Sequence, residues 1–72
     1  MQKIDLQNVV WREGENYVAM CLNTYISSFG DTREDALESL QEALELYFQD
    51  ESMSNLNEVA QPDIVNFSLQ HA

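Results

Sequence analysis

Acidic side chains are the residues of this chain that come closest to a catalytic set. Asp5 and Asp63 lie near the ends of expected strands, and glutamates recur along one expected helix, at Glu34, Glu38, Glu42 and Glu45. Two-metal nuclease chemistry needs carboxylates that converge on one pocket and hold Mg²⁺ ions about 4 Å apart. Helical spacing instead directs the glutamates away from the apolar stripe of that helix, into solvent. A metal-dependent nuclease is therefore the least favoured hypothesis, and we expect no catalytic residue.

Cysteine and histidine offer little further chemistry. Cys21 lies within an apolar run, so a buried small hydrophobic role is favoured over a reactive thiol, and no His or Lys nearby would activate it. His71 is next to the last residue. A structural zinc site needs about four such ligands. We expect no metal and no cofactor.

The charge of the chain is strongly one-sided. Lys3, Arg12 and Arg33 oppose 13 acidic residues, which gives a formal net charge of −10. Nucleic-acid binders neutralise phosphates with Lys and Arg, so direct nucleic-acid binding is not expected, nor is binding to anionic membranes. A basic protein partner is favoured by charge complementarity. The alternative is that the charge only keeps a small domain soluble.

Chain length indicates one small domain over residues 1–72. A core of this size supplies little net stability, and the single cysteine excludes an internal disulfide, so oligomerisation (dimer or tetramer) or a permanent partner is expected. Hydrophobic residues make up 44% of the chain, which is normal for a globular protein. The sequence shows no signal peptide and no membrane span, and a free thiol suits a reducing cytoplasm, where we expect the protein to act.

Hydrophobic patterning predicts the order β-β-β-α-β, an α+β domain. Strands are expected over about 4–12, 17–22, 24–29 and 63–69, the last one after Pro62. Apolar residues at three- and four-residue spacing predict an amphipathic helix over about 33–50, with Thr32 as its N-cap and Asp31 as a competing cap. The helix would cover one face of an antiparallel-rich sheet. The other face would stay open, and exposed apolar faces mark binding surfaces.

Several short motifs together resemble the HicB-like antitoxin family. They are a YVA strand beginning at Tyr17, a GDT turn beginning at Gly30 and a helix ending in the EALELY segment of residues 42–47. The resemblance covers roughly residues 9–50, with the motifs in the right order. It departs at residues 22–25, where many members have a proline and a glycine and this chain reads LNTY.

The resemblance implies a degenerate ribonuclease H-like fold and a function in a toxin–antitoxin pair. Such a domain binds and neutralises a small basic RNA-cleaving toxin of the HicA type by occluding its surface. Many members add a C-terminal DNA-binding domain, for which the ten residues after Pro62 leave no room, so we expect none here. The alternative hypothesis is an orphan homo-oligomeric structural or regulatory module without a toxin partner.

Three groups of residues are the candidate sites. Gly30, Asp31 and Thr32 are favoured as a structural turn and helix cap, with partner contact as the alternative. The aromatic residues are weak candidates for a partner or oligomer interface, since aromatics are enriched there: Trp11, Tyr17, Tyr25 and Phe29. The acidic helix face is most simply a solvated face, and alternatively a decoy for the RNA-binding surface of a toxin: Glu34, Glu38, Glu42 and Glu45.

Overall fold

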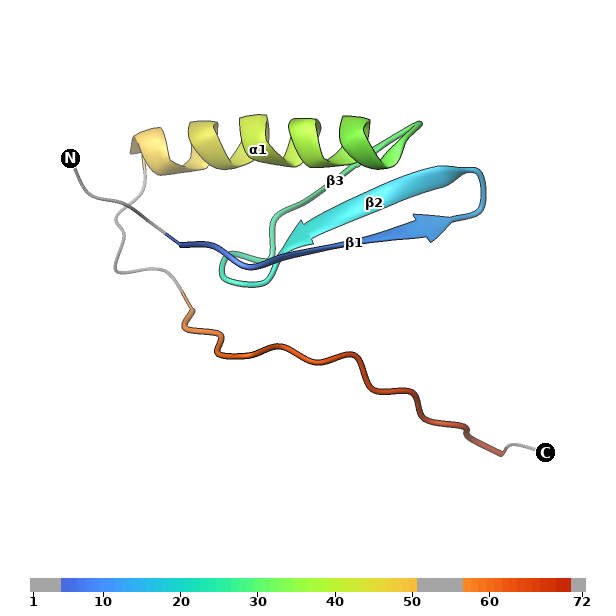
Figure 1. Ribbon diagram of the computed structural model, residues 1–72. Coiled ribbons are helices and arrows are strands. Elements are labelled where there is room, and N and C mark those ends of the chain that lie inside the picture. The colour runs from blue at the N-terminus through green and yellow to red at the C-terminus, as the bar shows by residue number, and fades with distance from the viewer. Residues whose placement is uncertain (1–4, 51–56, 71–72) are drawn as a thin grey trace.

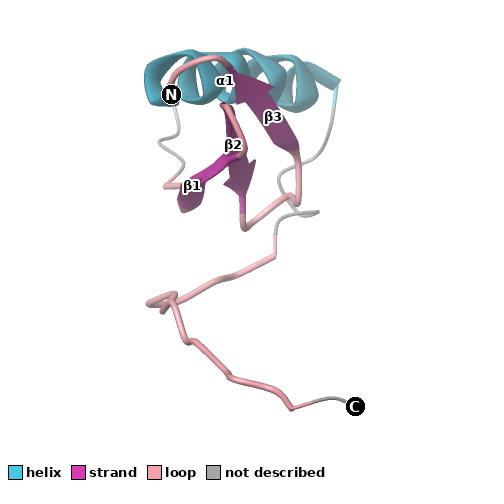
Figure 2. Cartoon of the chain, turned by 90° about the vertical axis from the view of Figure 1, so that its right-hand side faces the viewer, coloured by secondary structure: helices cyan, strands magenta, loops and turns pink. Residues whose placement is uncertain are grey.

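The computed structural model describes residues 5–50 and 57–70. Its elements are β1 (Asn8–Glu13), β2 (Asn16–Cys21), β3 (Ser27–Gly30) and α1 (Arg33–Asp50). The strands form one antiparallel sheet in the order β1-β2-β3, and α1 lies across one face of it (Figure 1, Figure 2). The α+β class and the antiparallel sheet with a single helix on one face are confirmed.

Strands β1 and β2 form a hairpin whose turn consists of Gly14 and Glu15, between the paired residues Glu13 and Asn16. Gly14 has a φ of +63°. Glycine reaches this left-handed region without a steric penalty, and two-residue hairpin turns favour it there. The turn lies between the first two predicted strands, over 4–12 and 17–22. The predicted strand over 4–12 is wrong at its start, because residues 5–7 are not in a strand and β1 begins at Asn8. It ends one residue later than predicted, at Glu13, and residue 4 lies outside the described residues.

The core lies between α1 and the helix-facing side of β2. Its buried hydrophobic side chains are Ala19, Cys21, Ala36, Leu40 and Leu44. Cys21 has no exposed surface, as expected for a small hydrophobe in an apolar strand. Small residues of β2 allow the helix to approach closely, and the larger leucines of α1 fill the space between the two layers.

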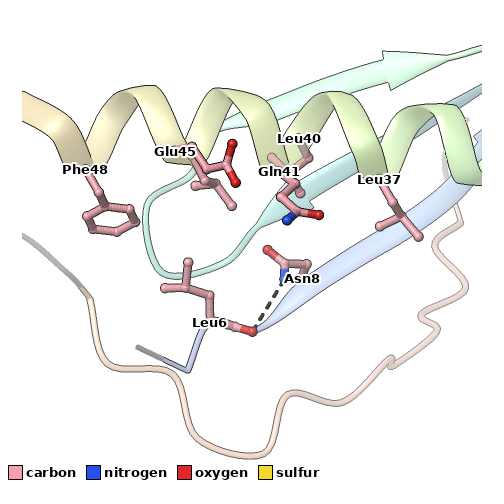
Figure 3. Close-up of a pocket in the computed structure, with 8 residues that line it drawn as sticks. Leu6, Asn8, Leu37, Leu40, Gln41, Glu45 and Phe48 are labelled. Carbon is pink, nitrogen blue, oxygen red and sulfur yellow. Dashed lines mark hydrogen bonds between the residues drawn. The ribbon is translucent and has the colours of Figure 1, made fainter. Parts of the chain in front are cut away.

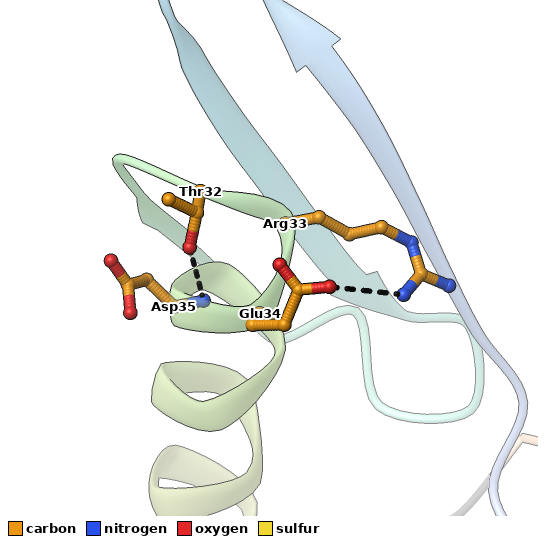
Figure 4. A network of polar contacts seen from close by, with 4 residues as sticks. All are labelled: Thr32, Arg33, Glu34 and Asp35. Carbon is orange, nitrogen blue, oxygen red and sulfur yellow. Dashed lines mark hydrogen bonds and ion pairs between the residues drawn. The ribbon is translucent and has the colours of Figure 1, made fainter.

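Helix α1 begins and ends where the sequence predicted. The backbone N–H of Asp35 donates to Oγ1 of Thr32 at 3.0 Å, so the N-cap is Thr32 and not Asp31 (Figure 4). Acidic residues in the first turn, Glu34 and Asp35, favour the helix because they face the positive end of its dipole.

The strand predicted over 24–29 is wrong at its start. Tyr25 has a φ of +64°, and its N–H donates to the carbonyl of Cys21 at 2.8 Å, which closes a turn and delays β3 until Ser27. A non-glycine residue in this left-handed region costs about 1–2 kcal/mol. The chain therefore accepts local strain in order to reverse direction between β2 and β3.

The predicted fourth strand over 63–69 is also wrong for the single chain. Residues 57–70 contain no strand, and this segment runs away from the helix and sheet (Figure 1, Figure 2). Its large hydrophobic side chains are exposed, with 92% of Ile64 and 81% of Phe67 accessible. A strand needs a neighbouring strand to pair its backbone groups. None of the described strands lies beside this segment.

Candidate protein-binding surface

The face of the sheet that α1 leaves uncovered carries an apolar row. Val18 of β2 pairs with Trp11 of β1 on one side and with Phe29 of β3 on the other. Directly paired residues point to the same face of a sheet. Since Ala19 and Cys21 point toward the helix, these three side chains point away from it.

A second row lies beside the first, formed by Val9 of β1 and Met20 of β2. We call the two rows together the open face: Val9, Trp11, Val18, Met20 and Phe29. Phe29 is 73% exposed and Trp11 is 39% exposed, whereas Val9, Val18 and Met20 are half-buried. Within the described residues, no helix or loop covers this surface, which is contiguous across all three strands.

Polar groups surround the apolar rows. The indole Nε1 of Trp11 donates to a carboxylate oxygen of Glu13 at 3.1 Å, which holds the ring at the end of β1. A hollow of about 200 Å³ lies between β2 and β3, and it is lined by Glu13, Asn16, Val18, Ser27, Ser28 and Phe29. An apolar centre with a polar, acidic rim is the usual composition of a protein interface.

The four aromatic residues that were predicted to form one interface lie at different places in the structure. Trp11 and Phe29 lie on the open face. Tyr17 lies on the opposite side of β2 and packs against the core, so it does not share a surface with them. Tyr25 lies in the loop before β3 and is 68% exposed. Sequence patterning could not separate these residues, because the separation depends on the register of the strands and on the turn at Tyr25.

The acidic helix residues form a solvent-exposed face of α1. Glu34, Glu38, Glu42 and Glu45 are all exposed. Three of them, Glu38, Glu42 and Glu45, line a polar hollow together with Gln41. Glu34 also lies 3.8 Å from the guanidinium of Arg33, an exposed pair that contributes little stability (Figure 4). The face is negatively charged over most of the length of the helix.

The Gly30-Asp31-Thr32 turn joins β3 to α1, and Gly30 is required there for lack of space. Gly30 is not in the left-handed region, unlike Gly14. A Cβ at Gly30 would lie 2.6 Å from the backbone nitrogen of Ala36 and 2.8 Å from the carbonyl carbon of Asp35. Glycine is needed because the first turn of α1 passes directly over this residue, and not for backbone freedom.

Sequence reasoning missed the role of Asn23, which is only 7% exposed. Its Oδ1 accepts from the N–H of Gln7 at 2.8 Å, and its Nδ2 donates to the carbonyl of Asn57 at 2.8 Å. Asn23, in the β2–β3 loop, is thus joined to the residue before β1 and to the start of residues 57–70, which we call the C-terminal segment. An asparagine after a strand signals a turn, but partners 16 and 34 residues away leave no local signal.

A groove beside β1 was also missed. It has a volume of about 510 Å³ and lies between β1 and α1 (Figure 3). Its apolar lining consists of Leu6, Leu37, Leu40, Leu44 and Phe48, and its polar lining consists of Asn8, Gln41 and Glu45. The apolar stripe of the helix was predicted only to cover one face of the sheet. The groove remains because α1 lies mainly over β2 and β3 and contacts β1 least.

Over residues 5–50 and 57–70, His, Cys, Asp and Glu side chains form no group of three or more that could hold a metal ion. In the same residues, no helix combines the length and the apolar character needed to cross a membrane.

Comparison with known proteins matches the chain to a family model. The model covers residues 2–70, and it is described as a family of unknown function, DUF7387. The chain belongs to this family. It has no significant match among curated proteins or among solved structures. The description of DUF7387 names no activity, ligand or partner, so the resemblance to HicB-like antitoxins stays a prediction.

Proposed function

We propose that this DUF7387 protein is a HicB-like antitoxin module, a cytoplasmic domain that binds a small basic RNA-cleaving protein of the HicA type. One observation carries the proposal: three neighbouring strands place Trp11, Val18 and Phe29 in one row on a sheet face that no described segment covers. Aromatic residues at the centre of an exposed apolar surface are the usual anchors of a protein interface.

Charge supplies the second part of the argument. The formal net charge of −10 repels nucleic acids and attracts basic proteins, so a basic partner would meet this domain faster than a neutral one. The acidic face of α1 and the carboxylate of Glu13 beside the open face extend this field over both sides of the domain. Polyanionic RNA is attracted to the same basic surface of the partner.

The proposed mechanism is occlusion. A toxin that cleaves RNA must expose basic residues to bind phosphates. When the acidic domain covers that surface, RNA can no longer approach it, and cleavage stops without any chemistry in the antitoxin. Neither a metal ion nor a catalytic residue is required of this chain.

Tyr25 is a second candidate contact residue. It combines 68% exposure of a large aromatic side chain with a φ of +64°. Glycine or asparagine would occupy this backbone position at lower cost. Strained residues that persist at exposed positions are candidates for function. We propose that the aromatic ring of Tyr25 contacts the partner.

The experiment is to mix the purified chain with a small basic HicA-type protein encoded beside it and to measure RNA cleavage and complex formation. We expect cleavage to stop at stoichiometric amounts. The double variant Trp11→Ala/Phe29→Ala should weaken binding by about 30-fold or more, because anchor residues contribute about 2 kcal/mol or more. Tyr25→Asn, which tolerates the backbone conformation, should weaken binding by a smaller factor.

Leu46→Ala is the matched control, because Leu46 is also a large exposed hydrophobic residue, 64% accessible, but it lies on α1. The Leu46→Ala variant should bind the basic protein as tightly as the unchanged chain does. Unaltered RNA cleavage in the mixture would contradict the antitoxin proposal. Equal loss of binding in Leu46→Ala and in the open-face variant would contradict the assignment of the open face.

The alternative function is an orphan homo-oligomer that buries the open face against the same face of another copy. The apolar rows of the open face support it, because a two-fold axis brings identical surfaces together. Native mass distinguishes the two. An oligomer that is lost in Trp11→Ala/Phe29→Ala and that ignores the basic protein would favour this alternative.

A further inference from the structure

The groove beside β1 and the C-terminal segment both expose apolar side chains and backbone without a strand partner among the described residues. The groove exposes the side chains of Leu6, Leu37 and Phe48 next to an edge of β1 that pairs with no other described strand. In the C-terminal segment, Phe67 and Leu69 are exposed by 81% and 86%. The groove and the segment both expose apolar side chains. The edge of β1 and the backbone of the segment both lack a strand to pair with among the described residues.

The segment has the side-chain period of a strand. Val65, Phe67 and Leu69 alternate with Asn66 and Ser68, so in an extended conformation they share one side. The three apolar residues would span about 13 Å, at about 3.3 Å per residue. Along α1, the groove extends from Leu37 to Phe48, which is about 16 Å at 1.5 Å per residue. The apolar side of the segment therefore matches the length of the groove.

We propose that the groove is filled by residues 63–69 of a second copy of this chain, which pair with the free edge of β1 while Val65, Phe67 and Leu69 insert beneath α1. The second copy receives the same segment from the first, so the dimer is a reciprocal strand exchange. The proposal is independent of the proposed antitoxin function, since it requires no other protein.

The placement of the segment favours a second copy as the occupant. Asn57 is held at Asn23 by hydrogen bonds of 2.8 and 2.9 Å, and beyond it the chain runs away from its own groove (Figure 1). Its apolar side chains lie in solvent, where another copy can bind them. In the exchanged dimer, both free β1 edges and both apolar segments would be covered at once.

Charge predicts how the dimer responds to salt. Each copy has a formal net charge of −10, so two copies repel each other, whereas Asp63 is the only ionisable residue within the exchanged segment. Raising the ionic strength screens this repulsion. The dimer should therefore become more stable with added salt. A complex with a basic protein should respond in the opposite direction, which separates the two interactions.

The first experiment measures native mass by light scattering for the full chain, at increasing protein concentration. We expect a monomer–dimer equilibrium that shifts toward dimer in salt. Phe67→Asp should abolish the dimer, because it places a charge in the groove. The matched control is Asn66→Asp, which adds the same charge on the opposite side of the segment and should leave the dimer intact.

The second experiment tests which chain fills the groove. Gln41 is exposed at the middle of the groove, and Phe67 is the middle apolar residue of the segment, so the pair is suitable for either strand direction (Figure 3). A chain carrying Gln41→Cys, mixed with a chain carrying Phe67→Cys, should form a disulfide-linked heterodimer on oxidation. Replacing Phe67→Cys by Asn66→Cys should greatly reduce the cross-link.

Three outcomes would overturn the inference. The chain could remain monomeric at millimolar concentration, or the dimer could persist in Phe67→Asp. The double variant Gln41→Cys/Phe67→Cys could close a disulfide within one monomer, which would show that the segment fills its own groove. None of these outcomes affects the antitoxin proposal, because these assays contain this chain alone.

Discussion

The helix–sheet body, which consists of β1, β2, β3 and α1, and the C-terminal segment contain similar residues in very different surroundings. In the body, Leu40 is 2% exposed and Cys21 is fully buried. In the segment, Ile64 is 92% exposed and Phe67 is 81% exposed. In both regions, the apolar residues recur at a regular spacing along the sequence. Only the body has a neighbouring layer against which these residues can pack.

The difference shows that a hydrophobic pattern is necessary for burial but not sufficient. The apolar stripe of α1 packs on a sheet whose strands already pair with each other through residues nearby in sequence. The segment follows residues 51–56, and its backbone pairs with none of the strands that the structure describes. A segment far along the chain is therefore buried only where the surface of the body still offers strand pairing or apolar contact.

The largest effect is expected in the centre of the body. Leu40→Ala should lower the free energy of unfolding by about 2–5 kcal/mol, because it leaves a cavity between α1 and β2. Urea unfolding followed by circular dichroism measures the loss. Leu46→Ala, at a residue that is 64% exposed on the same helix, should change it by less than about 0.5 kcal/mol. Equal losses would show that the assigned core is wrong.

A smaller effect is expected where α1 meets β3. Gly30→Ala should destabilise the body by about 1–3 kcal/mol, because the new Cβ would lie 2.6 Å from the backbone nitrogen of Ala36 and 2.8 Å from the carbonyl carbon of Asp35. Gly14→Asn is the comparison, since asparagine tolerates the positive φ and nothing lies within 4 Å of that Cβ position. Thermal unfolding of both variants tests this. A neutral Gly30→Ala would contradict the close approach of the helix.

Removing the N-cap of α1 should lower the free energy of unfolding by a smaller amount. Thr32→Ala removes the acceptor of the Asp35 N–H and should cost about 1 kcal/mol. Thr32→Ser keeps the hydroxyl and should restore most of the stability. Equilibrium unfolding of the two variants separates the hydrogen bond from other effects of the side chain, and a large loss in Thr32→Ser would argue against capping as its main role.

The smallest effect is expected in the C-terminal segment. At a dilution at which light scattering finds a monomer, Ile64→Ser should change the free energy of unfolding by less than about 0.5 kcal/mol, because the side chain is 92% exposed. Hydrogen exchange should show little protection of residues 63–69 under the same conditions. A loss above about 1 kcal/mol in the monomer would show that the segment packs on its own body.

Much of the body was predictable, because its signals are local. The helix over 33–50 follows from a regular apolar stripe and a threonine cap, and both were confirmed. The β1–β2 hairpin follows from apolar runs around a glycine turn. The start of β3 was predicted wrongly, because Tyr25 adopts a conformation that tyrosine rarely takes and no residue type signalled it.

The candidate surface was only partly predictable. Aromatic residues at Trp11, Tyr17, Tyr25 and Phe29 indicated an interface, but the strand register assigned only Trp11 and Phe29 to the open face. A shift of one residue in register would have reversed these assignments. The basic toxin that the motifs suggest as the partner is a proposal.

The sequence by itself determined the α+β class, the hairpin, the helix and its cap, and the strong negative charge. These depend on side-chain period, turn residues and composition, which act over a few residues or over the whole chain. Only the tertiary structure decided which residues share the open face, why Gly30 must lack a Cβ and how Asn23 reaches Gln7 and Asn57. It also decided that residues 63–69 pair with none of the described strands. These features depend on contacts between residues far apart in the chain, and no local pattern encodes them.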